Sequence, residues 1–326
     1  MSTIVLSHPL YKPGMDLLEK SGNEIIIPNS GNSDEILPQL QNADGFILRI
    51  GKIDRKAIEA CPKLRVITRP GVGVDNVDVK AATEKGIPVV ICPAANARSV
   101  AEHTIALLFA AAKNLVESDA ETRKGNFNIR NKYAAIEISG RKLSVLGFGH
   151  IGRIVAEMAV GIGMKIAVYD PLVPAAEIQA AGYEYAPTVE SAVSTGDFIT
   201  LHMPSLPSTK GMINEKLFHT MKKTAFFINC ARGDIVEEDA LYAALKNHVI
   251  AGAAVDVLKD EPMKSASPLM ALDNFIVTPH MAAQTQEATG SVVTMAVEGT
   301  LAVLSGKKWQ HVCNPEVYEH PKWKEQ

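Results

Sequence analysis

Short hydrophobic runs alternate with helix-like segments along this chain, in two separate series. The first series contains the runs TIVLS, EIIIP, GFILR, RVITR and PVVIC, and the second contains LSVLG, KIAVYD, DFITLH, AFFIN, AGAAVDV and NFIVTP. Strands that alternate with helices form parallel sheets that carry helices on both faces. The pattern therefore predicts an α/β protein with two doubly wound parallel-sheet domains.

Two longer segments have helical periodicity. From Ser99 to about Lys124 the apolar positions recur with a period of 3.6, and neither proline nor glycine interrupts them, which predicts one long helix. A second helical run extends from about Thr285 to Leu304. These two helices would join the domains.

Length, charge and cysteine usage narrow the class of protein. A chain of 326 residues is long enough for two domains. Its net charge of −3 argues against nucleic acid or a membrane surface as the main partner, since both attract concentrated positive charge. The four cysteines are widely spaced, and we find neither a signal peptide nor a long apolar run. We expect a soluble, cytoplasmic protein.

The segment LSVLGFGHIGR contains Gly147, Gly149 and Gly152 in G-x-G-x-x-G spacing. The spacing alone is a weak signal, but here it follows an apolar strand and opens a helix. The first glycine permits a tight turn, the second lets a pyrophosphate approach, and the third lets helix and strand pack closely. Free N–H groups at the helix N-terminus favour phosphate. The pattern predicts a dinucleotide site.

The next strand, KIAVYD, ends at Asp170, eighteen residues after Gly152. An acidic residue about 20 residues beyond the glycines accepts hydrogen bonds from the adenosine ribose. It would repel a 2′-phosphate, so we expect NAD(H) rather than NADP(H) as cofactor. The plainer alternative is a turn residue before Pro171.

Three charged or titratable residues follow strands in the second series. Arg232 follows AFFIN, Glu261 lies in AAVDVLKDEP, and His280 lies in FIVTPHMAAQ. Reduction of a 2-keto acid needs a cation for the carboxylate and an acid that protonates the carbonyl oxygen. Histidine can be that acid near neutral pH, and a neighbouring carboxylate favours its protonated form.

The other histidines have simpler interpretations. His202, close to the cofactor loops in sequence, is the reserve candidate for the acid, whereas His103 is expected to be a packed helix residue. We find no histidine pair with metal-ligand spacing, so we expect no metal.

From about residue 45 to 305 the chain resembles the D-isomer-specific 2-hydroxyacid dehydrogenases, and among them the phosphoglycerate dehydrogenases most closely. The motifs are GVGVDNVDVKAATEKGIPV, VLGFGHIGR, LHMPSLPSTKGMIN, INCARGDIVEEDAL, AAVDVLKDEP and VTPHMAA. The resemblance implies that Arg232 binds the substrate carboxylate and keto oxygen, and that His280, paired with Glu261, transfers the proton.

The resemblance implies further contacts. Backbone amides of Val72 and Gly73 would bind the substrate carboxylate, and Asp256 would meet the nicotinamide carboxamide. Besides the three glycines, the implied cofactor contacts are His150, Ile151, Asp170, Met203, Cys230, Ala231 and Asp256.

The resemblance also implies a domain organisation. Residues 1–98 and 287–326 would form a flavodoxin-like, substrate-binding (catalytic) domain, and residues 99–286 an inserted NAD-binding Rossmann domain. Family members are usually homodimers, with the inserted domain forming most of the contact.

Three more arginines bear on the choice of 2-hydroxy acid. Arg49 ends GFILR, Arg69 ends RVITR, and Arg130 lies in NIRNKY. In phosphoglycerate dehydrogenases, arginines at matching places surround the substrate phosphate, the last from across the dimer. The resemblance therefore favours 3-phosphoglycerate and phosphohydroxypyruvate as the substrate pair. Arg98, at the start of the first long helix, departs from the family pattern and would suit a different acidic substrate.

Other functions stay open at this stage. Hydroxypyruvate or glyoxylate reductase is the main alternative. Only Arg49, Arg69 and Arg130 favour a phosphoglycerate dehydrogenase over it. A second is an NAD(H)-sensing corepressor, which would keep a similar set of arginine, glutamate and histidine. Formate dehydrogenase is disfavoured, because it needs a glutamine where this chain has Glu261.

Overall fold

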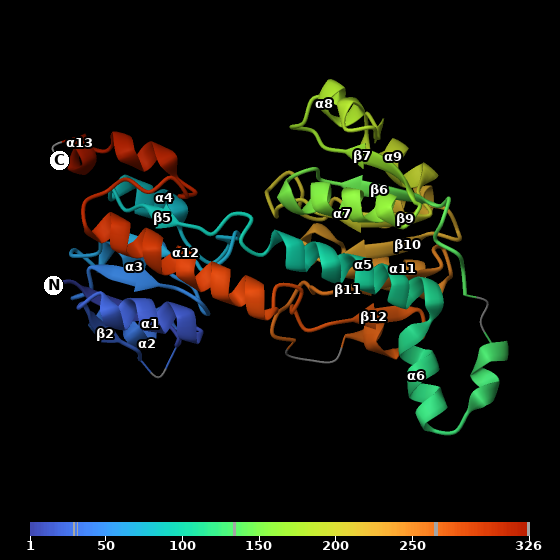
Figure 1. Cartoon of the computed structure of the whole chain (residues 1–326), viewed down its shortest axis with the longest axis horizontal. Coiled ribbons are helices and arrows are strands. Elements are labelled where there is room, and N and C mark those ends of the chain that lie inside the picture. Colours follow the sequence, from blue (N-terminus) through green and yellow to red (C-terminus); the bar gives the residue numbers. More distant parts are fainter. Residues whose placement is uncertain (29, 31, 133–134, 264–266, 325–326) are drawn as a thin grey trace. The chain divides into compact units, whose positions relative to one another are not determined.

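The computed structural model describes residues 1–28, 30, 32–132, 135–263 and 267–324. Contacts between residues divide the chain into two units, Met1–Asn96 with Gln284–Gln326, and Ala97–Ala283. Each unit has one fully parallel sheet (Figure 1), so the predicted α/β class is confirmed. In the described part of the chain, no helix is long and apolar enough to cross a bilayer.

The first unit contains a five-stranded sheet in the order β2-β1-β3-β4-β5. Helix α12 covers one face of this sheet, where it contacts α1, β3 and β4. The elements are β1 (Thr3–Leu6), α1 (Lys12–Lys20), β2 (Glu24–Ile26), α2 (Ser33–Leu40), β3 (Gly45–Ile47), α3 (Arg55–Glu59), β4 (Val66–Thr68), α4 (Val79–Glu84), β5 (Val89–Val90), α12 (Gln286–Leu304), η4 (Pro315–Glu319) and α13 (Pro321–Lys324).

The second unit contains a seven-stranded sheet in the order β12-β11-β10-β9-β6-β7-β8. The strand order reverses between β6 and β9, which is the place where dinucleotides bind in doubly wound sheets. The strands are β6 (Lys142–Leu146), β7 (Lys165–Tyr169), β8 (Glu184–Tyr185), β9 (Phe198–Leu201), β10 (Phe226–Asn229), β11 (Gly252–Val255) and β12 (Phe275–Val277). The helices are α5 (Ala97–Lys113), α6 (Leu115–Arg123), η1 (Phe127–Asn131), α7 (His150–Gly161), α8 (Ala175–Ala180), α9 (Val189–Thr195), α10 (Glu215–Thr220), η2 (Gly233–Ile235), α11 (Glu238–Lys246) and η3 (Pro268–Ala271).

Every strand that the hydrophobic runs predict is present. Strand β8 was not predicted, because two residues are too few to show a period. The predicted helix from Thr285 to Leu304 is also present, with Thr285 as its N-cap.

The predicted single helix from Ser99 to Lys124 is wrong. Asn114 has left-handed backbone dihedrals, φ 51° and ψ 38°, and it separates α5 from α6. Asparagine adopts this conformation more readily than most residues. Helix α5 buries many residues, whereas α6 buries none, so the chain turns where packing against the sheet ends. Helix α6 and η1 form an arm (Figure 1).

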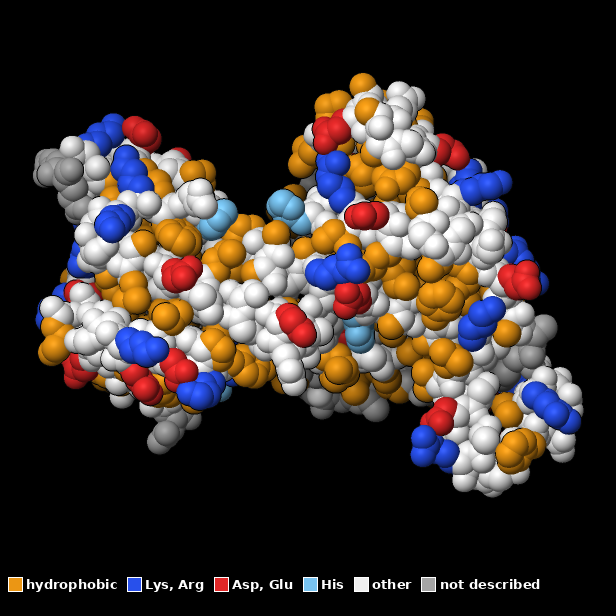
Figure 2. All heavy atoms as spheres, viewed as in Figure 1, with side chains coloured by type: hydrophobic (Ala, Val, Ile, Leu, Met, Phe, Trp, Pro, Cys, Tyr) orange, Lys and Arg blue, Asp and Glu red, His pale blue; other side chains and the backbone are white. Residues whose placement is uncertain are grey.

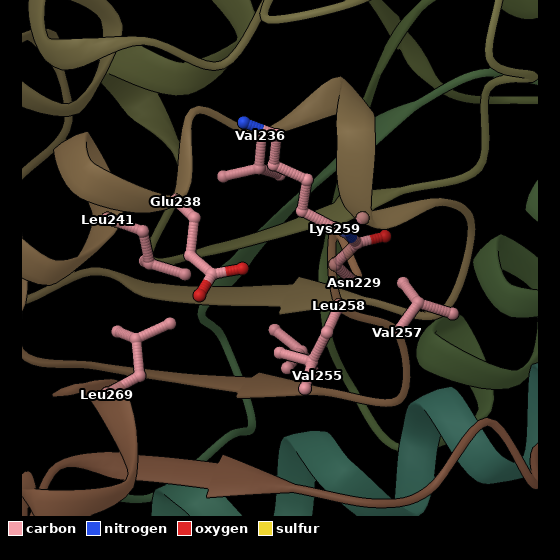
Figure 3. A pocket seen from close by; sticks show the side chains of 10 residues that line it. Asn229, Val236, Glu238, Leu241, Val255, Val257, Leu258, Lys259 and Leu269 are labelled. Carbon is pink, nitrogen blue, oxygen red and sulfur yellow. The ribbon is translucent and has the colours of Figure 1, made fainter. Parts of the chain in front are cut away.

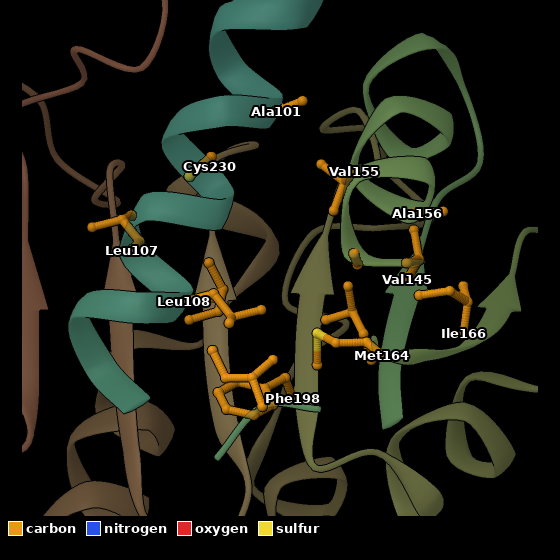
Figure 4. Packing of buried hydrophobic residues seen from close by; sticks show 14 of the residues in the cluster. Ala101, Leu107, Leu108, Val145, Val155, Ala156, Met164, Ile166, Phe198 and Cys230 are labelled. Atoms are coloured by element: carbon orange, nitrogen blue, oxygen red, sulfur yellow. The ribbon is translucent and has the colours of Figure 1, made fainter. Parts of the chain in front are cut away.

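Helices α5 and α7 pack together on one face of the seven-stranded sheet (Figure 4). Leu107 and Leu108 of α5 and Val155 of α7 meet Phe198 of β9 in one buried cluster. Burying such a side chain contributes roughly 1.5–3 kcal/mol. Cys230 belongs to the same cluster, so the end of β10 is anchored in this core.

The turn between β6 and α7 gives each glycine a different constraint. Gly147 has a φ of +101°, and a Cβ there would lie 2.6 Å from the His202 carbonyl oxygen. A Cβ on Gly152 would collide with the Gly147 carbonyl group. A Cβ on Gly149 would meet no described atom within 4 Å. Two glycines are therefore needed for packing, and the third faces open space.

We expect Gly152→Ala to lower the melting temperature, because the new methyl group overlaps the Gly147 backbone. Overpacking of this kind costs about 1–3 kcal/mol. Gly149→Ala is the matched control and should melt like the wild type in thermal denaturation followed by circular dichroism. Equal melting temperatures for both variants would contradict this account of the turn.

Candidate active site

The residues expected to bind the cofactor lie at one edge of the seven-stranded sheet. Parallel strands all end at the same edge, so segments far apart in sequence meet there. Asp256 follows β11, Cys230 and Ala231 follow β10, and Met203 lies just beyond β9. The glycine turn with His150 and Ile151 follows β6, and Asp170 follows β7.

The turn that carries Arg232 is held by a buried amide. Asn229 is 1% exposed, and its side chain accepts a hydrogen bond from Ala231 N and donates one to the Arg232 carbonyl oxygen. A Cβ on Gly233 would collide with the backbone of Leu258 and Lys259. The Arg232 turn therefore packs directly on the segment that leads to Glu261.

A small cavity lies under this turn (Figure 3). Asn229, Val236 and Glu238 line it together with Leu258 and Lys259. Its volume, about 10 Å³, is roughly what one water molecule needs. The cavity is therefore far too small for a substrate.

Glu261 and His280 form a close pair. Glu261 Oε2 lies 2.5 Å from His280 Nδ1, and Glu261 Oε1 accepts a hydrogen bond from Leu258 N at 2.7 Å. The imidazole is half exposed, at 52%. Because Nδ1 meets the carboxylate, Nε2 is the ring nitrogen that can exchange a proton with a ligand.

Charge and burial act in opposite directions on Glu261. Burial raises its pKa, but the hydrogen bonds from His280 and Leu258 N–H, together with the charges of His280 and Arg232, outweigh burial. The pKa of Glu261 therefore lies below its usual value of 4.5, and the carboxylate is ionised at neutral pH. An ionised carboxylate can only accept a hydrogen bond, so Nδ1 of His280 carries the hydrogen of this contact.

The buried carboxylate of Asp256 supports the loop that carries His280. Asp256 is 1% exposed and accepts hydrogen bonds from Thr278 Oγ1, Met281 N and Ala282 N. Its carbonyl oxygen accepts a bond from His280 N at 2.8 Å. These bonds hold His280 at a φ of +53°, which is uncommon for a residue with a side chain. The carboxamide contact of Asp256 stays a prediction.

The sequence interpretation missed Asn229 and Thr278. Thr278 Oγ1 donates to Asp256 and lies 3.0 Å from Nε2 of His103. His103 is thus hydrogen-bonded to the loop of His280, besides being largely buried. The sequence offered only their positions as a signal: Asn229 directly precedes Cys230, and Thr278 lies two residues before His280.

His202 is unsuited to be the reserve acid, and that expectation is corrected. Burial lowers the pKa of His202 to about 3, so its ring is neutral at physiological pH. Its Nε2 lies 2.9 Å from Thr200 Oγ1. Cys230 is equally inert, because burial raises the pKa of its thiol to about 12.

The residues of the glycine turn fit a dinucleotide. Gly149 leaves open space in front of the N-terminus of α7, where a pyrophosphate would lie. Asp170 accepts hydrogen bonds from Phe148 N at 2.7 Å and from Leu172 N at 2.8 Å. Its carboxylate therefore fixes the glycine turn. His150 is exposed, and Met203 is buried.

In the first unit, Arg49, Arg69 and the loop with Val72 and Gly73 lie beyond neighbouring strands β3 and β4. Arg49 donates hydrogen bonds to Pro9 O and Tyr11 Oη, and Arg69 donates one to Pro70 O. Val72 is 47% exposed. These groups all lie at the carboxyl edge of the five-stranded sheet.

Other arginines are on the surface. Arg130 is exposed on η1. Arg98 pairs with Glu102 at 2.7 Å, and Arg153 pairs with Glu177 at 2.6 Å. Figure 2 shows that positive and negative side chains are interspersed on the face it presents.

Comparison with known proteins identifies the family. Residues 105–282 match the model of the D-isomer specific 2-hydroxyacid dehydrogenase, NAD binding domain. The chain is 41% identical to a D-3-phosphoglycerate dehydrogenase of Methanocaldococcus jannaschii, over 96% of this chain and 60% of that protein. It is 36% identical to a glyoxylate reductase of Korarchaeum cryptofilum, over 86% of each chain.

A solved structure agrees with these matches. It is the NAD-dependent formate dehydrogenase of Staphylococcus aureus in complex with NAD, with a TM-score of 0.85 and 27% identity over 95% of this chain and 97% of that one. The matched domain binds NAD in this family, so NAD is confirmed as the expected cofactor. Its preference over NADP(H) stays a prediction. The chain belongs to the D-isomer-specific 2-hydroxyacid dehydrogenases.

Proposed function

We propose that this protein is an NAD-dependent dehydrogenase that interconverts a D-2-hydroxy acid and its 2-keto acid. The observation that carries the proposal is the Glu261–His280 pair, with the positive charge of Arg232 acting on the same carboxylate. An acid, its orienting anion and a cation are the groups that keto-acid reduction requires.

The proposed roles follow from the chemistry of these groups. Arg232 binds the substrate carboxylate and keto oxygen with its planar guanidinium. NADH, when bound, supplies the hydride that reaches the carbonyl carbon. His280 gives its proton from Nε2 to the carbonyl oxygen, and Glu261 stabilises the protonated ring before that transfer. Oxidation of the hydroxy acid runs the same steps in reverse.

The second unit would hold the cofactor, and residues of the first unit would contact the substrate. The turn that contains Gly147, Gly149 and Gly152 would bind the pyrophosphate in front of Gly149, and Asp170 would bind the adenosine ribose. Backbone amides of Val72 and Gly73 would help bind the substrate carboxylate. These assignments rest on the family resemblance and on the place of each residue at a sheet edge.

For the substrate pair we propose 3-phosphoglycerate and phosphohydroxypyruvate. Arg49, Arg69 and Arg130 would bind the phosphate, and relatives named D-3-phosphoglycerate dehydrogenase support this choice. The chain spans about half to 60% of the length of those relatives. A glyoxylate reductase of matching length keeps a reductase of unphosphorylated acids as the second candidate.

We also propose a cytoplasmic homodimer. Helix α6 buries no residue, and Leu115, Val116 and Phe127 on the arm are each more than half exposed. A second copy that covered these side chains would remove apolar surface from water. Arg130 belongs to the same arm, consistent with a role across the dimer. The free thiols of Cys61, Cys92, Cys230 and Cys313 suit a reducing compartment.

The first measurement is a series of initial rates of NADH oxidation with phosphohydroxypyruvate, hydroxypyruvate, glyoxylate, oxaloacetate and sulfopyruvate. We expect kcat/KM to favour phosphohydroxypyruvate by about a hundredfold, roughly 2.7 kcal/mol of transition-state binding. Preference for an unphosphorylated acid would support the second candidate. No turnover of any acid, with NADH bound tightly, would support a sensor instead.

The cofactor preference is tested with the best substrate of that series. We expect a higher kcat/KM with NADH than with NADPH, because the Asp170 carboxylate would repel a 2′-phosphate. Equal values for the two cofactors would contradict the role assigned to Asp170. Asp170→Asn should reduce the difference in kcat/KM between NADH and NADPH, although it also weakens the hydrogen bond from Phe148 N.

Glu261→Gln tests the acid pair through the pH dependence of reduction. The wild-type carboxylate has a lowered pKa, so it stays charged across the neutral range. A negative charge beside an imidazole is expected to favour the protonated ring. Without this charge, the alkaline limb of the kcat/KM profile should move to lower pH, and kcat at pH 8 should fall by about 10²-fold. An unchanged profile would remove Glu261 from the mechanism. Asp260→Asn, on the adjacent exposed residue, is the matched control.

A further inference from the structure

Arg49 is held in a defined position by partners that carry no charge. Its Nη1 donates a hydrogen bond to Pro9 O at 3.0 Å, and its Nη2 donates one to Tyr11 Oη at 3.2 Å. The guanidinium carbon lies 4.7 Å from the centre of the Tyr11 ring, so the ring also covers one face of the cation. Its backbone N–H binds Ser7 Oγ at 2.9 Å.

Tyr11 is itself fixed from a distant part of the chain. Its hydroxyl donates a hydrogen bond to Gln284 Oε1 at 2.7 Å, across 273 residues of sequence. Gln284 directly precedes Thr285, the N-cap of α12, and belongs to the same unit as Tyr11 and Arg49. The phenol group thus accepts from Arg49 and donates to Gln284, which sets the orientation of its ring.

The neutrality of these partners separates Arg49 from surface arginines of the same protein. Arg98 and Arg153 each face a glutamate within 3 Å, and Arg55 lies 2.6 Å from Glu84. A carboxylate partner would cancel the charge that an incoming anion needs. A carbonyl oxygen, a phenol and an aromatic face orient the cation while its positive charge stays uncompensated. The orientation and the uncompensated charge of Arg49 therefore suit the binding of an anion from outside the described chain.

We propose that Tyr11 is a positioning residue that gives this protein its preference for a phosphorylated substrate, because it holds Arg49 ready to bind the phosphate. The inference rests on the proposed function, in which Arg49 meets that phosphate. A long arginine side chain loses conformational freedom when it binds a ligand, and prior fixation removes that loss. Two of its five N–H groups are engaged, which leaves others for phosphate oxygens.

The test compares Tyr11→Phe and Tyr11→Leu with phosphohydroxypyruvate and hydroxypyruvate as substrates. Tyr11→Leu removes both the ring and the hydroxyl, so KM for phosphohydroxypyruvate should rise on the order of tenfold. Tyr11→Phe keeps the ring, so the rise should be about threefold. The kcat should stay near the wild-type value, and kcat/KM for hydroxypyruvate should change by less than about twofold.

Two further variants make the result specific. Tyr242→Phe is the matched control, because Tyr242 also lies beneath a cation, Lys246 at 5.3 Å, but on α11 in the other unit. It should behave like the wild type. Arg69→Ala is the reference for the phosphate site itself and should raise KM for phosphohydroxypyruvate. Melting temperatures and NADH affinity check that each variant is folded.

The outcomes separate the two proposals. Suppose that the wild type prefers phosphohydroxypyruvate and that Arg69→Ala reduces this preference. If both Tyr11 variants then keep the wild-type preference, the inference about Tyr11 is overturned and the proposed function stands. Equal losses for both keto acids would assign Tyr11 a general structural role and overturn the inference too. A wild type without any preference would overturn the substrate assignment, and the Tyr11 inference with it.

Discussion

The site depends on one constraint, that all strands of a parallel sheet end at the same edge. In the seven-stranded sheet this rule brings together the ends of β7, β6, β9, β10 and β11, which lie between Lys142 and Val255 in the sequence. Each strand end needs only a short turn to present its side chain. The glycine turn, Asp170 and the Arg232 turn therefore share one edge without any long loop.

Buried polar groups give these turns their rigidity. The Asn229 amide closes the turn of Arg232, and the Asp256 carboxylate binds three groups of residues 278–282. A buried carboxylate without partners would be unstable, so the loop of His280 must close around Asp256. That closure places the imidazole beside Glu261. The Glu261–His280 pair therefore depends on the hydrogen bonds that two carboxylates, Asp256 and Glu261, accept from this part of the chain.

The two sheets use positive charge in different ways. In the second unit, the charge of Arg232 helps to keep Glu261 ionised. In the first unit, Arg49 rests on Tyr11 and on a carbonyl oxygen, so no described anion within hydrogen-bonding distance competes for its charge. Surface arginines such as Arg153 pair with glutamates instead. Whether an arginine is available for an anionic ligand depends on whether its partners are carboxylates or neutral groups.

The sequence by itself determined the strands and the glycine turn, and it indicated Arg232, Glu261 and His280 as candidate site residues. These signals are local: hydrophobic runs, glycine spacing and residues next to strand ends. Tertiary structure decided the rest. The break at Asn114 lies where packing on the sheet ends, and His202 is neutral because other segments bury it. The contacts of Tyr11 with Arg49 and Gln284 join residues 38 and 273 positions apart. Such contacts leave no periodic trace in a sequence, since only folding brings their members together.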